Sequence, residues 1–167
     1  AATGAAGTAV GVAGFPYIVG SAALGQGGSV APSERITMGC IGVGWQGGSN
    51  MGQFLREKDC QIVAICDVDK KTLQGAVNNV NRRYGNQDCA AYTDFRELLA
   101  RKDIDAVSLG LPDHWHAIPA IEAARSGKDI FGEKPLSHDF REGRAMCNAV
   151  KQYGRIWQTG SWQRSQA

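Results

Sequence analysis

The chain contains 167 residues, of which 43% are hydrophobic and 20% are charged, and its formal net charge is +2 at pH 7. These proportions are typical of a globular protein with one core, and the length is that of about one domain. Basic and acidic residues are interspersed after residue 34, whereas proteins that bind nucleic acids gather their basic residues on one face. We therefore expect no nucleic-acid partner.

The first 33 residues differ from the rest of the chain, because they contain no Asp, Glu, Lys or Arg. Ala, Gly, Val and Ser dominate this stretch, and it has too few strongly apolar residues for a helix that crosses a bilayer. We interpret residues 1–33 as the remnant of an export signal followed by a linker, with a disordered low-complexity tail as the alternative. No stable membrane span is expected.

From residue 35 onward, short apolar runs alternate with stretches that carry apolar residues at helical spacing. One of the helices is expected to begin after Asp94, with Glu97 completing a pattern that resembles a capping box. Strands are predicted at 36–43, 61–66, 90–92, 105–110, 129–132 and 156–159, and helices at 47–56, 70–83, 95–101, 117–126 and 141–153. This alternation indicates an α/β fold, a doubly wound parallel sheet of the Rossmann type in a three-layer α/β/α arrangement. We expect residues 34–160 to form this domain.

The five cysteines contain no Cys-x-x-Cys pair. Cys40 and Cys66 fall within predicted strands, where an unpaired cysteine behaves as a small apolar residue. We expect neither a disulfide framework nor a metal site built on these thiols.

The loop after the first predicted strand runs from Gly42 to Gly47 and has the pattern Gly-x-Gly-x-x-Gly. In this pattern Gly42 permits a tight turn, Gly44 lets the backbone approach a pyrophosphate, and Gly47 lets the next helix pack closely on the strand. The N-terminus of that helix adds unpaired N–H groups that favour phosphates. The loop predicts a dinucleotide site, and a glycine-rich turn that binds nothing is the alternative.

Asp67 follows the second predicted strand directly. A carboxylate at this point can accept hydrogen bonds from the adenosine ribose hydroxyls, and it would repel a 2′-phosphate. The next residues are Val68 and Asp69, with no adjacent Arg or Lys. NAD is therefore favoured over NADP as the cofactor. The alternative is that Asp67 caps the next helix, although Asp69 is better placed to do so.

Two further loops follow the fourth and fifth predicted strands. The first runs from Leu111 to His116 and is polar and aromatic, so we expect it to lie against the middle of the cofactor. One of its two histidines, His114 or His116, is expected to cap the next helix or to contact ribose, and no ligand set completes a metal site around them.

The second of these loops is Glu133-Lys134-Pro135. Lys134 would project from the strand end toward the nicotinamide, where an ammonium can hydrogen-bond a substrate hydroxyl and stabilise the alkoxide that forms as hydride leaves. Pro135 would stiffen the turn and fix the direction of the lysine. The alternative is an exposed ion pair between Glu133 and a nearby base.

Together these loops resemble the Gfo/Idh/MocA family, named after glucose–fructose oxidoreductase and inositol dehydrogenase. The resemblance extends from residue 35 to about residue 165. It rests on these residues: Gly42, Gly44, Gly47, Asp67, Pro112, His116, Glu133, Lys134 and Pro135. The uncharged leader is similar to the exported branch of the family, which uses the twin-arginine route to the periplasm. Without export, a cytoplasmic location is expected.

The resemblance implies two domains, an N-terminal NAD(P)-binding domain and a C-terminal α+β domain that shapes the substrate pocket and supplies an acid–base histidine. We expect the second domain to be absent from this chain and residues 161–167, which resemble the crossover into it, to place Gln163 or Arg164 near the nicotinamide. We expect the fragment to be inactive alone and the full-length form to be a homo-oligomer.

The leading hypothesis is an oxidoreductase that transfers hydride between NAD and the hydroxyl of a small-molecule substrate, a sugar, polyol or related compound. Lys134 and His116 are the predicted catalytic residues. The predicted cofactor-binding residues are Gly42, Gly44, Trp45, Gln46, Gly47, Asp67, Leu111, Pro112, His114 and Glu133. Two alternatives remain: a glycosidase of the same family that uses NAD transiently, and a non-catalytic dinucleotide-binding domain.

Overall fold

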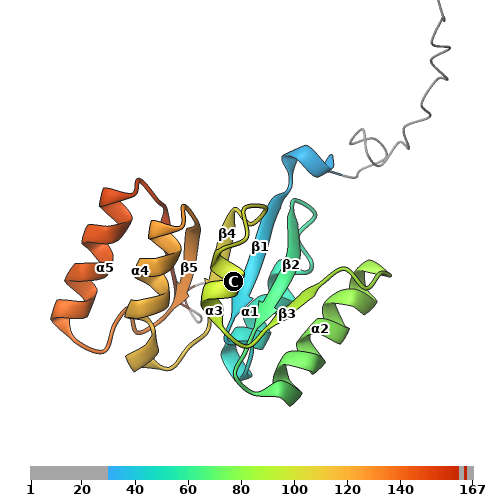
Figure 1. Ribbon diagram of the computed structural model, residues 1–167, viewed down its shortest axis with the longest axis horizontal. Coiled ribbons are helices and arrows are strands. Elements are labelled where there is room, and N and C mark those ends of the chain that lie inside the picture. The colour runs from blue at the N-terminus through green and yellow to red at the C-terminus, as the bar shows by residue number, and fades with distance from the viewer. Residues whose placement is uncertain (1–29, 162–163, 165–167) are drawn as a thin grey trace, which may run out of the picture.

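The chain forms a six-stranded parallel sheet with helices on both faces (Figure 1). The computed structural model describes residues 30–161 and residue 164. The strand order is β3-β2-β1-β4-β5-β6, so the chain winds outward in both directions from β1. This order confirms the predicted doubly wound sheet. The strands are β1 (Ile36–Ile41), β2 (Cys60–Cys66), β3 (Ala90–Tyr92), β4 (Ala106–Leu109), β5 (Asp129–Glu133) and β6 (Trp157–Gly160).

The helices divide between the two faces of the sheet. Met51 and Val77, on the first two helices, belong to one buried apolar cluster, whereas Leu98, Ala120 and Met146, on the other three, belong to a second. The three-layer arrangement is therefore confirmed. The helices are α1 (Trp45–Phe54), α2 (Lys70–Tyr84), α3 (Phe95–Leu99), α4 (Ala117–Arg125) and α5 (Phe140–Gln152), and the short 3-10 turns are η2 (Pro32–Glu34) and η3 (Asp113–Trp115).

Three helices begin at an aspartate that caps the first turn. The carboxylate of Asp69 accepts the N–H of Thr72 at 2.6 Å and opens α2. The carboxylate of Asp94 opens α3 in the same way, and that of Asp139 opens α5. Such a cap satisfies N–H groups that have no partner within the helix. The caps expected at Asp69 and Asp94 are thus confirmed.

Several predicted boundaries were wrong by one or two residues. The first strand ends at Ile41 and not at residue 43, because Gly42 adopts a φ of 75° and turns the chain out of the sheet. α1 accordingly begins at Trp45 and not at Gly47. α3 ends at Leu99, before residue 101, because the backbone N–H of Arg101 bonds the carbonyl of Leu98, three residues back, and so leaves the α-helical pattern.

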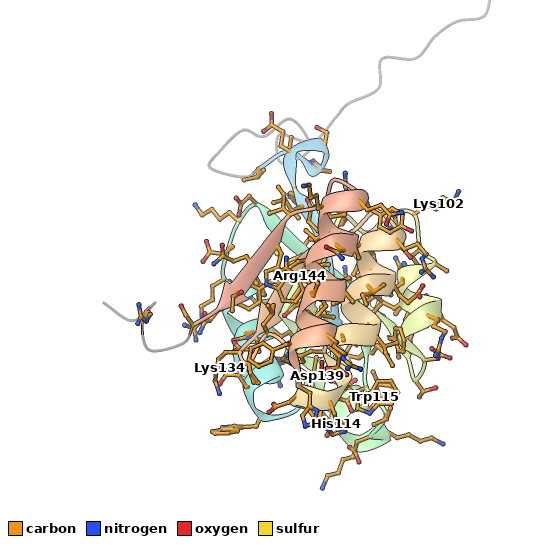
Figure 2. The ribbon with its side chains drawn as sticks, turned by 90° about the vertical axis from the view of Figure 1, so that its left-hand side faces the viewer. Lys102, His114, Trp115, Lys134, Asp139 and Arg144 are labelled. Carbon is orange, nitrogen blue, oxygen red and sulfur yellow. The ribbon has the colours of Figure 1, made fainter. Side chains whose placement is uncertain are left out.

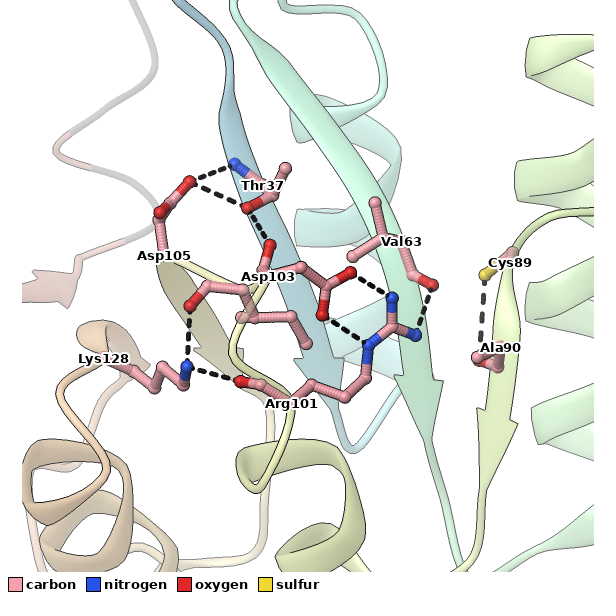
Figure 3. A network of polar contacts seen from close by, with 9 residues as sticks. Thr37, Val63, Cys89, Ala90, Arg101, Asp103, Asp105 and Lys128 are labelled. Atoms are coloured by element: carbon pink, nitrogen blue, oxygen red, sulfur yellow. Dashed lines mark hydrogen bonds and ion pairs between the residues drawn. The ribbon is translucent and has the colours of Figure 1, made fainter. Parts of the chain in front are cut away.

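A polar network holds the connection between α3 and β4 against the amino ends of the central strands (Figure 3). The Asp105 carboxylate accepts the N–H of Thr37 at 2.8 Å, and the Thr37 hydroxyl lies within hydrogen-bonding distance of both the Asp105 carboxylate and the carbonyl oxygen of Asp103. Arg101 donates two hydrogen bonds to the Asp103 carboxylate. These bonds hold the pKa of Asp103 below its ordinary value.

Lys128 completes this network from the connection between α4 and β5. Its side chain is buried, and its ammonium donates to the carbonyls of Arg101 and Ile104 at 2.6 and 2.8 Å. Burial lowers the pKa of Lys128. A hollow of about 630 Å³ lies here, and its lining includes Lys128 and Arg155. The polar side chains at this edge bind one another and the backbone, so we assign them a structural role.

No helix within residues 30–161 is long and apolar enough to cross a membrane. The predicted leader lies outside the described residues, apart from its last four. Gln163 also lies outside them, and the backbone N–H of Arg164 bonds the carbonyl of Ser161.

Candidate cofactor-binding site

The segments that follow β1, β2, β4 and β5 meet at the carboxyl edge of the sheet, because all of these strands run in one direction. His114, Trp115, Lys134 and Asp139 lie at this edge, at the bottom of Figure 2, and Lys102 lies at the opposite edge. The sequence-predicted site residues described below come from these four segments and from the start of α1.

The glycines of the first loop bring three backbone segments into direct contact. A Cβ on Gly47 would lie 1.9 Å from the carbonyl oxygen of Gly42 and 3.3 Å from the Cα of Gly110. A Cβ on Gly110 would in turn lie 2.5 Å from the Cα of Gly47. The loop after β1, the first turn of α1 and the end of β4 therefore touch through backbone atoms alone.

Gly44 occupies a different environment. A Cβ there would meet no atom of the described residues within 4 Å, so space is open in front of the backbone. Gly44 is also the N-cap of α1 and, as a glycine, provides no side-chain cap. The positive end of the α1 dipole therefore lies beside this open space, an arrangement that suits a phosphate.

Asp67 lies beside the glycine loop, as the order of the motifs requires. One carboxylate oxygen accepts the N–H of Val43 at 2.9 Å, and the other accepts the N–H of Asp69 at 2.9 Å. Asp69 caps α2, so the alternative of Asp67 as the helix cap is wrong. The hydrogen bond from the Thr72 N–H lowers the pKa of Asp69, and burial raises the pKa of the Cys66 thiol to about 12. The Cys66 thiol is therefore neutral at pH 7.

Glu133 is buried at the end of β5, with 5% of its surface exposed. One carboxylate oxygen accepts the side-chain N–H of Asn50 at 2.8 Å and lies 3.5 Å from the side-chain nitrogen of Gln46. The other accepts the backbone N–H of Lys134 at 3.3 Å. The alternative of an exposed ion pair at Glu133 is therefore wrong. The carboxylate instead joins the turn that carries Lys134 to the start of α1.

His116 is 1% exposed, and its ring bridges two loops. Nδ1 lies 2.6 Å from the carbonyl oxygen of Pro135, and Nε2 lies 2.8 Å from that of Leu111. His116 occupies the N-cap position of α4, as expected for one of the two histidines, but its side chain makes no capping hydrogen bond. The ring therefore joins the loop after β4 to the turn after β5, and a catalytic role for His116 stays a prediction.

The remaining predicted residues lie on the surface of the same edge. Lys134 is exposed directly after β5 (Figure 2), and the peptide bond between it and Pro135 is cis. His114 and Pro112 are exposed in the loop after β4, and Leu111 packs partly into the core beneath them. Trp45 projects from the start of α1 with 87% of its surface exposed. No group of metal-binding side chains occurs within the described ranges.

Two residues of the site were not predicted. Gly110 follows a strand and belongs to no motif. Its contact with Gly47 depends on the pairing of β4 with β1, so no local sequence pattern could identify it. Asn50 is 5% exposed on α1. A polar residue on the apolar face of a predicted helix is the signal that could have identified it.

The two glycine environments predict opposite effects of adding one methyl group. Gly47→Ala should lower the free energy of unfolding by about 3 kcal/mol, because the new Cβ overlaps backbone that cannot move freely. Gly44→Ala should change it by less than about 1 kcal/mol. Urea unfolding followed by circular dichroism measures both. Equal losses in the two variants would contradict this description of the loop.

The two histidines of the loop after β4 provide a second matched pair. His116→Ala should lower the free energy of unfolding by about 3 kcal/mol, because it empties a buried volume and leaves the two carbonyls without the ring. His114→Ala, on the exposed surface, should change it by less than about 0.5 kcal/mol. Thermal and urea unfolding of both variants would decide, and a His116→Ala variant as stable as the parent would refute the bridge.

Comparison with known proteins gives three findings. The sequence profile described as the GFO_IDH_MocA oxidoreductase family, NAD-binding Rossmann fold, matches residues 36–161. A glycosyl hydrolase family 109 protein from Shewanella sp. (strain ANA-3) is 38% identical over 115 residues, which are 66% of this chain and 25% of that protein. The myo-inositol 2-dehydrogenase of Lactobacillus plantarum superposes with a TM-score of 0.70 at 27% identity, covering 79% of this chain and 38% of that one.

The WlbA dehydrogenase of Bordetella pertussis, solved in complex with NADH and UDP-GlcNAcA, has a TM-score of 0.70 at 25% identity and covers 80% of this chain and 39% of its own. The chain thus spans about a quarter of the length of the curated relative and under half of each solved structure. The family profile extends over the whole described sheet, from β1 to β6. This chain belongs to the Gfo/Idh/MocA family of oxidoreductases and is its NAD-binding Rossmann domain.

Proposed function

We propose that this chain is the cofactor domain of an enzyme that transfers hydride between NAD and a hydroxyl of a sugar, a polyol or a related compound. The observation that supports it best is the distribution of charge along the carboxyl edge. The Asp67 carboxylate stands at the glycine loop on one side of α1, and the Glu133–Lys134 pair stands at the end of β5 on the other. The Asp67 carboxylate suits the adenosine end of a dinucleotide, and the Glu133–Lys134 pair suits its nicotinamide end.

The residues present fit NAD. The open space at Gly44 and the start of α1 would hold the pyrophosphate, and Asp67 would accept hydrogen bonds from the adenosine ribose. Trp45, Gln46, Leu111, Pro112 and His114 would form the walls of the site. When bound, NAD supplies the atom that accepts or donates hydride. The negative charge of Asp67 would disfavour the additional phosphate of NADP.

Lys134 would act on the substrate. Its exposed ammonium can donate a hydrogen bond to the reacting hydroxyl and stabilise negative charge that develops on that oxygen. His116 would hold the turn after β5 against the loop after β4, because its ring contacts both carbonyls. Lys134 is thus proposed as a catalytic residue and His116 as a positioning residue.

A second candidate function is an NAD-dependent glycosidase, and the similarity to a protein named as a glycosyl hydrolase favours it. Such an enzyme would oxidise one sugar carbon, eliminate the leaving group and restore the carbon, so the loops that hold NAD could be the same. A second domain, proposed to follow this one, would carry the residues that decide between the two reactions.

We also propose that the full-length enzyme is a homo-oligomer and that it is exported. The support for export is the uncharged, weakly hydrophobic stretch of residues 1–33. A protein that must fold around NAD would acquire the cofactor before export, which is compatible with a route for folded proteins.

Asp67 should determine the choice between NAD and NADP. Asp67→Asn keeps an oxygen that can accept the Val43 N–H but removes the charge. The variant should bind NADH about tenfold more weakly, because hydrogen bonds to a charged group are replaced by neutral ones. Its preference for NADH over NADPH should narrow. Calorimetric titration with each nucleotide measures both effects, and Asp69→Asn, which keeps a helix cap, is the matched control.

Catalysis is tested with the full-length protein. Supplied with NAD and a panel of sugars and polyols, it should produce NADH, whereas this chain alone should bind NAD without turnover. Lys134→Met should lower kcat by about 100-fold, as expected for loss of a group that stabilises the transition state, while Lys102→Met at the opposite edge should not.

Release of an aryl group from a chromogenic glycoside without net NADH would instead support the glycosidase. Binding without either reaction would support a non-catalytic domain.

A further inference from the structure

Glu133 is a buried carboxylate with no cationic partner among the described residues. The ion pairs within residues 30–161 involve Asp94, Asp103, Glu122 and Asp129, not Glu133. Its three hydrogen-bond donors are two side-chain amides and one backbone N–H, all of them neutral. Buried charges are normally paired, because hydrogen bonds to neutral groups replace only part of the hydration that the charge loses.

The surroundings fix this carboxylate in place. A Cβ on Gly160 would lie 2.6 Å from Oε1 of Glu133, so the end of β6 closes over it on one side. The amide of Asn50 approaches the same oxygen from α1. The Lys134 ammonium, one residue along the chain, makes no ion pair with it and is exposed. The negative charge is therefore held between the start of α1 and the turn that carries Lys134.

The oxidised nicotinamide ring carries a positive charge, and the reduced ring carries none. The proposed function places the nicotinamide end of NAD at this same turn, next to Lys134. We propose that Glu133 is a specificity-determining residue for the oxidation state of the cofactor: its charge stabilises bound NAD⁺ relative to bound NADH. This inference rests on the proposed function, and it adds that the domain itself favours the form of the cofactor that accepts hydride.

The test is the ratio of the dissociation constants for NAD⁺ and NADH, measured by calorimetry with this chain. Glu133→Gln keeps the size and hydrogen-bonding capacity of the side chain and removes its charge. It should weaken NAD⁺ binding relative to NADH binding by about tenfold, which corresponds to about 30 mV in the potential of the bound two-electron couple. Glu133→Asp, which keeps the charge, should restore most of the ratio.

A second variant tests the same idea without altering the buried carboxylate. Gln46 is half-buried on α1 with its side-chain nitrogen 3.5 Å from Glu133, so Gln46→Lys would place an ammonium beside the carboxylate and neutralise it. The ratio should shift in the same direction as in Glu133→Gln. Glu57→Gln, which removes an exposed carboxylate just after the C-terminal end of α1, is the control and should leave the ratio unchanged.

The outcomes separate this inference from the proposed function. If the unaltered chain binds neither nucleotide, the proposed function is overturned and the inference with it. If the chain binds both and the ratio is unchanged in Glu133→Gln and Gln46→Lys, the role of Glu133 in selecting the oxidation state is overturned and the cofactor site stands. A shift in Glu133→Gln that Glu133→Asp largely reverses, and that is absent from Glu57→Gln, establishes it.

Discussion

The cofactor edge of this domain depends on one backbone contact, in which α1 meets the ends of β1 and β4 without any intervening side chain. Gly47 packs against the carbonyl of Gly42 and the Cα of Gly110 so closely that there is no room for a Cβ at position 47. This contact sets the position of the helix start. The open space at Gly44, the approach of Asp67 to Val43, and the reach of Gln46 and Asn50 to Glu133 all follow from where α1 begins.

Much of this arrangement could be predicted from the sequence. Each predicted strand is present, and the apolar runs of the four central strands, β1, β2, β4 and β5, are buried in the sheet. The order of strands and helices was sufficient to predict the winding. Asp67 could be placed beside the glycine loop because parallel strands bring their carboxyl ends together. The strand end at Gly42 was misplaced, because a positive φ is permitted by glycine but not required by it.

Other features could not be predicted, because they depend on contacts between distant segments. The ring of His116 faces inward to two carbonyls, although its neighbour His114 is exposed, and no local pattern distinguishes the two. The Asn50 side chain meets a residue of β5 across the sheet edge. The short motifs therefore identified which loops form the site, whereas the pairing of their side chains required the fold.

The polar network at the amino ends of the strands has a consequence for how this domain can vary. Lys128, Arg101 and the Asp103–Asp105 segment join the central strands to the connections before β4 and β5, at the edge farthest from the cofactor loops. This network therefore lies at the opposite edge of the sheet from the residues proposed for catalysis. Substitutions of exposed side chains at the carboxyl edge, such as His114 and Lys134, can consequently alter binding or chemistry without disturbing the network.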